Sequence, residues 1–504
     1  MQAAIGGDKR FNFGLDFQFK PDNLSASRRS GEKRFRILLL ADLSGRAQRG
    51  IQDASDLGAR PCLRVDLDEF DSILMKYAPR IEWPIGPVTV TELDDFHPDQ
   101  LYRNLEVFKT LRATRKKLKD PSSFSDTARQ LRAEKHIEPS VKESPQDTAD
   151  DDDVFNRLLG RPLETSQSAQ PAPPSDTLAS LIQQIVAPYI VPETDPQLTQ
   201  YIASVDMAIG DQMRAILHHR DFQALETVWR GIWDLVTSLE LSESLELDLL
   251  DVTKGELLDD LRRHKADLAA SGLHRQWIDR AIGTPGGHPW SLLVGHYHFG
   301  ANDDDIELLA GLGLLASRAG APFMADAHAS LLGCASASQY LEPSEWAAAH
   351  PMFAELRKSP AASWIGLTVP RILTRLPYGQ RSDEIDSFMF EELGGEPDHE
   401  HFLWGSSALA CAKLLGLAFQ AQGWAFTPES SLDLEDLPAY IILSEDGKKP
   451  QPAAEIVMSD RIGDEISRRG LMALMSYRNR NAVRVQNLQS VSDPPTRLSG
   501  PWAG

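Results

Sequence analysis

The sequence has few cysteines, no long apolar run and no excess of basic residues. Its three cysteines, Cys62, Cys334 and Cys411, are far apart and odd in number, which argues against a disulfide framework, a CxxC zinc site or a redox pair. No stretch approaches the roughly 18 consecutive apolar residues of a transmembrane helix, and residues 1–10 lack the apolar centre of a signal peptide. A formal net charge of −21 argues against a dedicated nucleic-acid-binding protein, because neutralising phosphates needs a basic face. We therefore expect an acidic cytoplasmic protein with no membrane insertion and no nucleic-acid partner.

What is present is ordinary globular composition, with 42% hydrophobic and 25% charged residues in 504. Stretches with strand and helix periods alternate along the chain, which predicts an α/β fold class with mixed sheets. We expect an N-terminal β arm and connector at 1–33, a small α/β domain at 34–120 and a larger one at 178–490. A disordered linker at 121–177, rich in Ser, Asp, Gln and Pro, would join them, and a flexible tail would follow at 491–504.

The N-terminal arm has an apolar residue at every second position, the period of a strand with one apolar face. These residues are Phe11, Phe13, Leu15, Phe17 and Phe19. Left unpaired, such a strand is an aggregation hazard, so we expect it to have a partner. Two alternatives stay open: the strand pairs within its own domain, or it joins the edge of a sheet on another molecule.

Within the linker, one short apolar island stands out. It consists of Val154, Phe155, Leu158 and Leu159, around two polar residues. An island of this kind is typical of a docking motif, and equally of a turn that packs on the nearest domain.

The candidate catalytic and cofactor motifs are weak. Gly311–Ala316 has the form GxGxxA of a dinucleotide fold, but the residues ahead of it already have a helical pattern. We interpret its glycines as small residues inside a buried helix. The chain has no GxSxG nucleophile elbow and no phosphate-binding P-loop, so we expect no catalytic residues, no cofactor and no enzyme.

Two groups of histidines are candidate metal ligands. His296 and His298 would point to the same side of a strand, and His399, Glu400 and His401 form a second group. Neither group has a third and fourth ligand at familiar spacing, so the sequence predicts no metal site.

Three motifs in the first quarter of the chain resemble the small contractile-sheath protein of type VI secretion, TssB (VipA). They are ILLLADLSG at 37–45, VDLDEFD at 65–71 and LDDFHPD at 93–99. The last of these is the most specific.

The second half resembles the large sheath protein, TssC (VipB). The matching stretches are LETVWRG at 225–231, GLTVPRILTRLPYG at 366–379, FLWG at 402–405 and the run 470–489. The motifs fall in family order and the two resemblances together cover about four fifths of the chain.

The resemblance implies that both sheath subunits are fused in one chain. In that family the subunits polymerise by strand donation into a cylinder around an Hcp tube, attached to a baseplate, and a ClpV-type AAA+ ATPase recycles the contracted form. By this resemblance the arm would be the donated strand, and the 154–159 island would be the ATPase-docking helix or a remnant of the small subunit's C-terminal helix.

One departure from the family leaves an alternative open. Large subunits continue well past the stretch that matches residues 487–489, whereas about 15 residues follow it here. A fused protomer that polymerises is one expectation; a sheath-like cap, terminator or baseplate adaptor that binds a sheath end is the other.

Overall fold

The computed structural model describes residues 17 and 185 and eight continuous stretches of the chain. These stretches are 34–120, 122–133, 198–283, 287–394, 398–430, 432–444, 447–477 and 480–502. Within them, no helix is both long and apolar enough to cross a membrane.

The chain divides into two compact units, each built from separate parts of the sequence. The unit that we call the sheet unit comprises Met1–Tyr77, Thr227–Leu376 and Phe402–Gly504. The other, the helical unit, comprises Ala78–Glu226 and Pro377–His401. These boundaries differ from the predicted domains at 34–120 and 178–490, because each unit contains residues from both halves of the chain.

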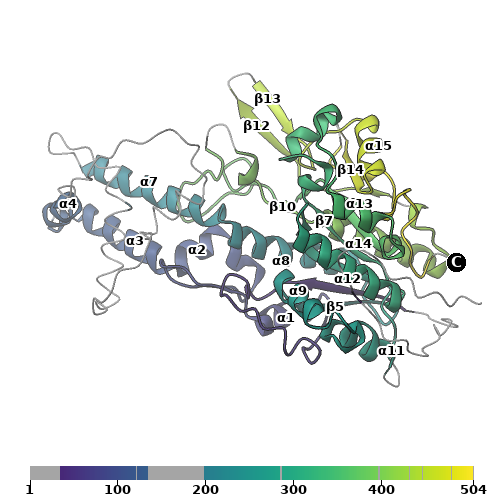
Figure 1. Cartoon of the computed structure of the whole chain (residues 1–504). Coiled ribbons are helices and arrows are strands. Elements are labelled where there is room, and N and C mark those ends of the chain that lie inside the picture. Colours follow the sequence, from purple (N-terminus) through teal and green to yellow (C-terminus); the bar gives the residue numbers. More distant parts are fainter. Residues whose placement is uncertain are drawn as a thin grey trace, which may run out of the picture. The chain divides into compact units, whose positions relative to one another are not determined.

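The sheet unit is built on a nine-stranded mixed sheet (Figure 1), with the strand order β11-β15-β14-β8-β7-β6-β1-β5-β2. The strands are β1 (Phe35–Ala41), β2 (Leu63–Val65), β5 (Leu245–Asp251), β6 (Leu292–Phe299), β7 (Phe323–Ala327), β8 (Ile365–Val369), β11 (Asp433–Leu434), β14 (Met472–Ser476) and β15 (Val483–Val485). The strands from β5 to β14 in this order pair in parallel, and β2, β15 and β11 are antiparallel additions at the two sides. The predicted α/β class with mixed sheets is confirmed.

Helices cover both faces of this sheet, which explains why its central strands are continuous apolar runs. α14 (Ser407–Gln422) packs on β1, β6, β7 and β8, and α12 (Asp303–Ala319) packs on β6, β7 and β8. On the face of α12, Leu38 and Leu40 of β1 join one hydrophobic core with Leu250 and Leu293. The other described α-helices of this unit are the part of α8 (Arg220–Ser238) from Thr227 on, α1 (Phe70–Tyr77), α9 (Lys254–Arg263), α10 (Gly272–His274), α11 (Arg280–Ile282), α13 (Pro351–Arg357) and α15 (Asp460–Arg468).

Two small antiparallel pairs complete the sheet unit. They are β9 (Ile372–Leu373) with β10 (Trp404–Gly405), and the hairpin of β12 (Tyr440–Ser444) and β13 (Gly447–Gln451).

In its described residues, the helical unit consists of helices and one short strand pair. Its elements are β3 (Arg80–Ile81), β4 (Val88–Thr89), α2 (Pro98–Asn104), α3 (Glu106–Lys119), α4 (Phe124–Ala133), α7 (Leu198–Leu217) and the beginning of α8 (Arg220–Ser238). α3 packs against α2, α4 and α7. Pro98 and the apolar stripe that follows it predict one helix over 98–119. The backbone of Leu105 is instead extended, with φ −73° and ψ 135°, so that two helices form.

Two predicted flexible segments are partly ordered. α4 lies inside the linker predicted at 121–177, while residues 134–177, including the island, lie outside the described residues. The tail predicted at 491–504 is also packed: Val491 and Leu498 are fully buried, and the Ser499 amide donates to the Ser363 carbonyl at 2.8 Å. Prediction from polarity and proline content missed these few apolar residues, which are sufficient to hold the tail on the sheet unit.

Candidate functional site: the junction of the N-terminal and C-terminal segments

The chain joins an N-terminal segment (residues 34–133) to a C-terminal segment (residues 198–502) by an extensive set of contacts in each unit. The closest of these contacts are made by β1, which lies between β5 and β6. β1 pairs with β5 along its whole length, from Phe35 opposite Leu245 to Ala41 opposite Asp251, and with β6 over four residues. The N-terminal segment therefore supplies a central strand of a sheet that the C-terminal segment otherwise builds.

Charged side chains reinforce this pairing where β1 and β5 begin. Glu246 of β5, whose side chain is 1% exposed, binds Arg34 at 2.9 Å, Arg36 at 2.8 Å and Arg64 at 2.6 Å. Arg36 also lies over the ring of Trp290, 3.9 Å from its centroid. One buried carboxylate thus fixes three cations of the N-terminal segment, which aligns the two segments in register.

A second network lies just beyond the end of β5. Glu256 of α9 is fully buried and accepts hydrogen bonds from Arg46 at 2.6 Å and Arg60 at 3.1 Å, while it closes the N-terminal capping box with Thr253. Burial by itself would raise the pKa of Glu256, but the bonds from Arg46 and Arg60 outweigh it and hold that pKa below its usual value. The carboxylate is therefore charged in the folded protein and ties α9 to the N-terminal segment.

Asp251, the last residue of β5, binds the turn that follows β1. Its carboxylate accepts the Leu43 amide at 2.8 Å and the Ser44 hydroxyl at 2.7 Å. Trp229 of α8, fully buried, donates its indole N–H to the Leu43 carbonyl at 2.9 Å. Two elements of the C-terminal segment, β5 and α8, thus bind one turn of the N-terminal segment.

In the helical unit, the family-like motif at 93–99 holds a loop of the C-terminal segment. The Asp99 carboxylate accepts the backbone amides of Ser387 at 2.9 Å and Asp386 at 3.2 Å. Burial would raise the pKa of Asp99, but the interaction with the Ser387 side chain and the bonds from these two amides outweigh it and hold that pKa below its usual value. His97, which caps α2 by accepting the Asp99 amide, lies edge-on against the Tyr378 ring, 4.9 Å between centroids. One motif of each resemblance, 93–99 and 366–379, is therefore in contact here.

Ring and ion contacts extend this second junction. Tyr102 of α2 stacks on Phe388 with centroids 4.6 Å apart, and Arg115 of α3 pairs with Asp206 of α7 at 2.5 Å. Met389, beside Phe388, is 87% exposed.

We expect Asp99→Ala to loosen the loop without unfolding the protein. Two charge-assisted hydrogen bonds are lost, which should cost about 1–3 kcal/mol of local stability. Hydrogen exchange read by mass spectrometry should show residues 384–390 exchanging at least tenfold faster. Asp126→Ala, at an exposed position of α4, is the matched control; unchanged exchange in Asp99→Ala would show that the ring contacts alone hold the loop.

A buried serine–aspartate pair in the sheet unit resembles a nucleophile and its partner. Asp326 of β7 accepts the Ser407 hydroxyl, the Thr368 hydroxyl and the Ala408 amide, each at 3.0 Å. Ser407 and Thr368 are fully buried. A substrate has no path to a fully buried hydroxyl, so this pair is not arranged as a nucleophile. Its hydrogen bonds instead attach the start of α14 to β7 and β8 of the sheet.

The two groups of candidate metal ligands lie on different elements, one on β6 and one on a 3-10 turn. On β6, His298 is exposed and His296 is enclosed, and this enclosure lowers the pKa of His296 to about 4, against the opposing effect of Asp326. A bulge between Gly295 and His298 interrupts the regular register with β7.

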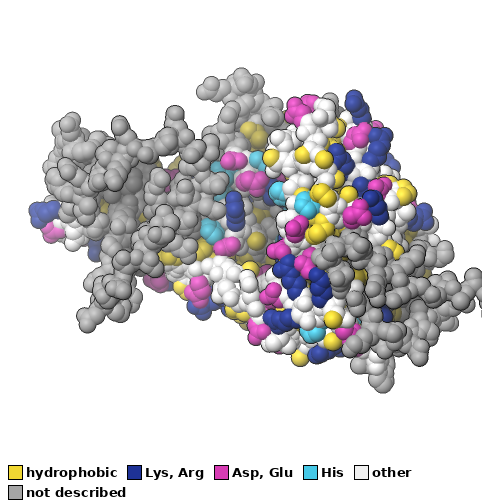
Figure 2. Space-filling view, in the orientation of Figure 1, with side chains coloured by type: hydrophobic (Ala, Val, Ile, Leu, Met, Phe, Trp, Pro, Cys, Tyr) yellow, Lys and Arg dark blue, Asp and Glu magenta, His cyan; other side chains and the backbone are white. Residues whose placement is uncertain are grey.

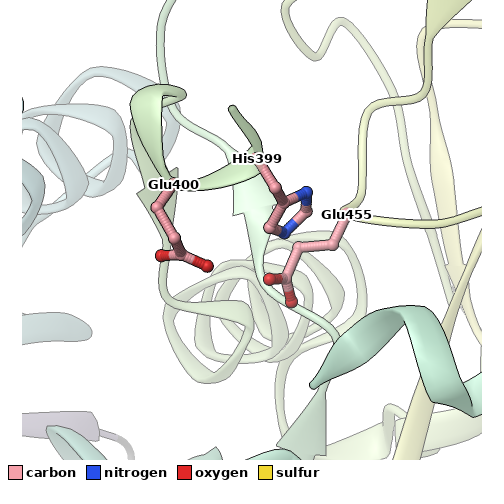
Figure 3. Close-up of side chains that lie close together, drawn as sticks. All are labelled: His399, Glu400 and Glu455. Carbon is pink, nitrogen blue, oxygen red and sulfur yellow. The ribbon is translucent and has the colours of Figure 1, made fainter. Parts of the chain in front are cut away.

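The other histidine group lies on the 3-10 turn His399–His401. Figure 3 draws His399 and Glu400 together with Glu455. The Glu455 carboxylate already binds Arg371: its Oε1 lies 2.7 Å from Arg371 Nη2, and its Oε2 accepts the Arg371 backbone amide at 2.8 Å. Since His399 and Glu400 belong to the helical unit and Glu455 to the sheet unit, we derive no metal site from them.

Of the five apolar arm residues predicted from the sequence, the structure describes only Phe17. It packs against the core of the sheet unit. The other arm residues and the island at 154–159 lie outside the described residues. Sequence reasoning missed the networks around Glu246 and Glu256, although acidic residues inside an otherwise apolar strand, as in LELDLLD of β5, are a signal of buried ion pairing.

Comparison with known proteins identifies both segments. Residues 199–492, more than half of the chain, match the VipB family, described as "EvpB/VC_A0108, tail sheath N-terminal domain". Residues 18–149 match the family described as "Type VI secretion system, VipA, VC_A0107 or Hcp2".

A curated relative agrees with this assignment. The type VI secretion system sheath protein TssC1 of Pseudomonas aeruginosa is 32% identical over 303 residues, which are 58% of this chain and 61% of that protein. The chain thus spans about three fifths of the length of this relative. It belongs to the family of type VI secretion tail-sheath proteins, with a VipA-type segment ahead of a VipB-type tail-sheath domain.

Proposed function

We propose that this chain is a structural subunit of a type VI secretion sheath in which one polypeptide supplies both the VipA-type and the VipB-type part of a protomer. Its partners are then other copies of itself or other sheath subunits. Membership of two families of sheath proteins supports a structural, non-enzymatic role. We further propose that it acts in the cytoplasm, around an Hcp tube, in contact with a baseplate.

The observation that carries this proposal is the position of β1. A strand from the VipA-matching segment lies between two strands of the VipB-matching segment, with full register along β5. Two segments that share one sheet must fold together, so their fusion in one chain favours a fixed one-to-one ratio and a high effective concentration of the two parts.

The N-terminal arm is the element that we propose to link protomers. Its alternating Phe11, Phe13, Leu15, Phe17 and Phe19 suit addition to the sheet of a neighbour, where main-chain hydrogen bonds supply affinity. We propose a second contact, with a ClpV-type ATPase, for the island of Val154, Phe155, Leu158 and Leu159. Binding of a 150–165 peptide to the N-domain of such an ATPase tests it, and absence of binding would retire that role.

The assembly proposal predicts that purified full-length protein forms long cylinders in negative-stain electron microscopy. Deletion of residues 1–20 should abolish these assemblies and leave a folded monomer, because the donated strand is lost while the core is kept. Light scattering measures the size and circular dichroism the folding. Assemblies of unchanged size in the deletion variant would count against strand donation.

A different microscopic result would favour the second candidate role. If the protein decorates only one end of cylinders formed by another sheath pair, and forms none by itself, it acts as a cap or adaptor.

A further inference from the structure

The surface that α9 and α12 form around Gly311 holds a residue from far away in the sequence. Phe17 is partly buried there and packs against the core of the sheet unit. A Cβ atom at Gly311 would lie 3.5 Å from Phe17 Cζ and 2.6 Å from Leu261 Cδ1. The absent side chain of Gly311 thus lets α9 approach α12 and lets a phenyl ring reach the surface where they meet. In Figure 2 acidic and basic side chains lie together near the place where Figure 1 labels α9.

Charged groups line the rim of this surface. Lys265 Nζ lies 5.5 Å from the centroid of the Phe17 ring, within the range of a cation–π contact. Glu307 of α12 binds Arg262 at 2.7 Å and Lys265 at 3.5 Å. The cation over the ring is therefore held in place by a carboxylate on the opposite helix.

The two glycines of the GxGxxA stretch have different neighbours. A Cβ atom at Gly313 would lie 2.6 Å from Ile365 Cδ1, on the side of the sheet, and Phe17 is not among its nearest contacts. The missing side chain of Gly313 thus makes room for Ile365 of β8, whereas that of Gly311 makes room for both Leu261 of α9 and Phe17.

We propose that this surface, built by Gly311, Leu261 and Lys265, is the seat of the chain's own N-terminal arm, with Phe17 as the anchor. The arm then rests on its own sheet unit until assembly, and Phe17 must leave the seat before the arm can join a neighbour. The second part rests on the proposed function, in which the arm links protomers.

Phe17 must leave the seat because the seat and the sheet of a neighbour compete for the same segment, the N-terminal arm. Phe17 belongs to the same alternating face as the other apolar arm residues, so a ring buried on α9 and α12 is not available to the sheet of another copy. Seating protects an apolar strand from nonspecific pairing and lowers the tendency to assemble. A weaker seat should therefore favour assembly, while loss of the arm should abolish it.

The seat itself is tested by hydrogen exchange on the full-length protein at concentrations where mass photometry finds monomers. We expect amides of residues 14–20 to be protected in the wild type, and Phe17→Ala to raise their exchange at least fivefold. Phe13→Ala, which changes the same face of the arm at another position, is the matched control and should change exchange less than twofold. Absence of protection in the wild type, or protection that disappears on dilution because it comes from a second copy, would overturn the seat.

Competition is tested from the side of the seat, so that the arm stays intact. Lys265→Ala removes the cation over the ring and should lower the protein concentration at half-assembly by a factor of about two to five. Lys358→Ala, which breaks a comparable exposed pair with Glu355, should leave that concentration unchanged. An unchanged or higher assembly concentration for Lys265→Ala would overturn competition.

The two experiments separate this inference from the sheath role. Protection of the arm in a protein that never assembles would support the seat and contradict the sheath role. Normal cylinders from a protein whose arm is unprotected would do the reverse.

Discussion

Residues 185–504 expressed alone are expected to be insoluble, and co-expression of residues 1–133 as a separate chain is expected to rescue them as a one-to-one complex. The isolated C-terminal part lacks β1, which leaves β5 and β6 with unpaired backbone groups in the middle of the sheet. It also exposes apolar side chains such as Leu249 and Leu293 that are fully buried in the folded chain. Yield in the soluble fraction and co-purification through a tag on one part measure the effect.

The control for this experiment is the order of addition. Because the two segments share a core, mixing them after separate purification from denaturant should succeed only when both refold together. A soluble 185–504 fragment with a cooperative unfolding transition of its own would contradict the shared sheet.

Glu256→Ala is expected to destabilise the sheet unit by about 3–5 kcal/mol, the typical consequence of removing one partner from a buried ion pair. The substitution leaves Arg60, whose side chain is 6% exposed, without its main counter-charge and opens the capping box of α9. The urea midpoint, followed by tryptophan fluorescence, should fall clearly. Glu355→Ala, in an exposed ion pair of the same unit, should leave the midpoint unchanged.

The pH dependence of the same site has a definite sign. The pKa of Glu256 lies below its ordinary value of 4.5 in the folded protein, so its contribution is complete above that pH and is lost as the pH falls through the lower, folded value. Wild-type stability should therefore fall more steeply below about pH 4.5 than that of Glu256→Gln. Parallel curves for the two proteins would mean that Glu256 does not carry the charge.

Local sequence patterns predicted several elements of the sheet unit. The apolar run RFRILLLADL at 34–43 predicts a strand covered on both faces, and β1 occupies Phe35–Ala41 within it. The helical pattern of residues 254–263 matches α9. The pattern could not reveal the neighbours of β1, because β5 lies about 210 residues further along the chain and any buried parallel strand would satisfy the same apolar run. The predicted small domain at 34–120 therefore had the right strand but lacked its partners.

Two other features depend on tertiary contacts that local patterns do not show. No glycine or proline at Leu105 signals the break between α2 and α3. The extended backbone there follows from the tertiary packing of the two helices, which local propensity does not show. The motif LDDFHPD was recognised by resemblance, but its task of binding two backbone amides through Asp99 depends on a loop almost 290 residues away. Backbone amides carry no signature in the sequence.

The central place of β1 also has a mechanical consequence. The arm precedes β1 in the sequence, and this strand is bonded on one side along its whole length and on the other over four residues. Tension on the arm along the strand axis loads these bonds in shear, so many of them must break at once, whereas tension on an edge strand can peel its bonds one after another. A tether that ends in the middle of a sheet can therefore carry a large load before the subunit yields.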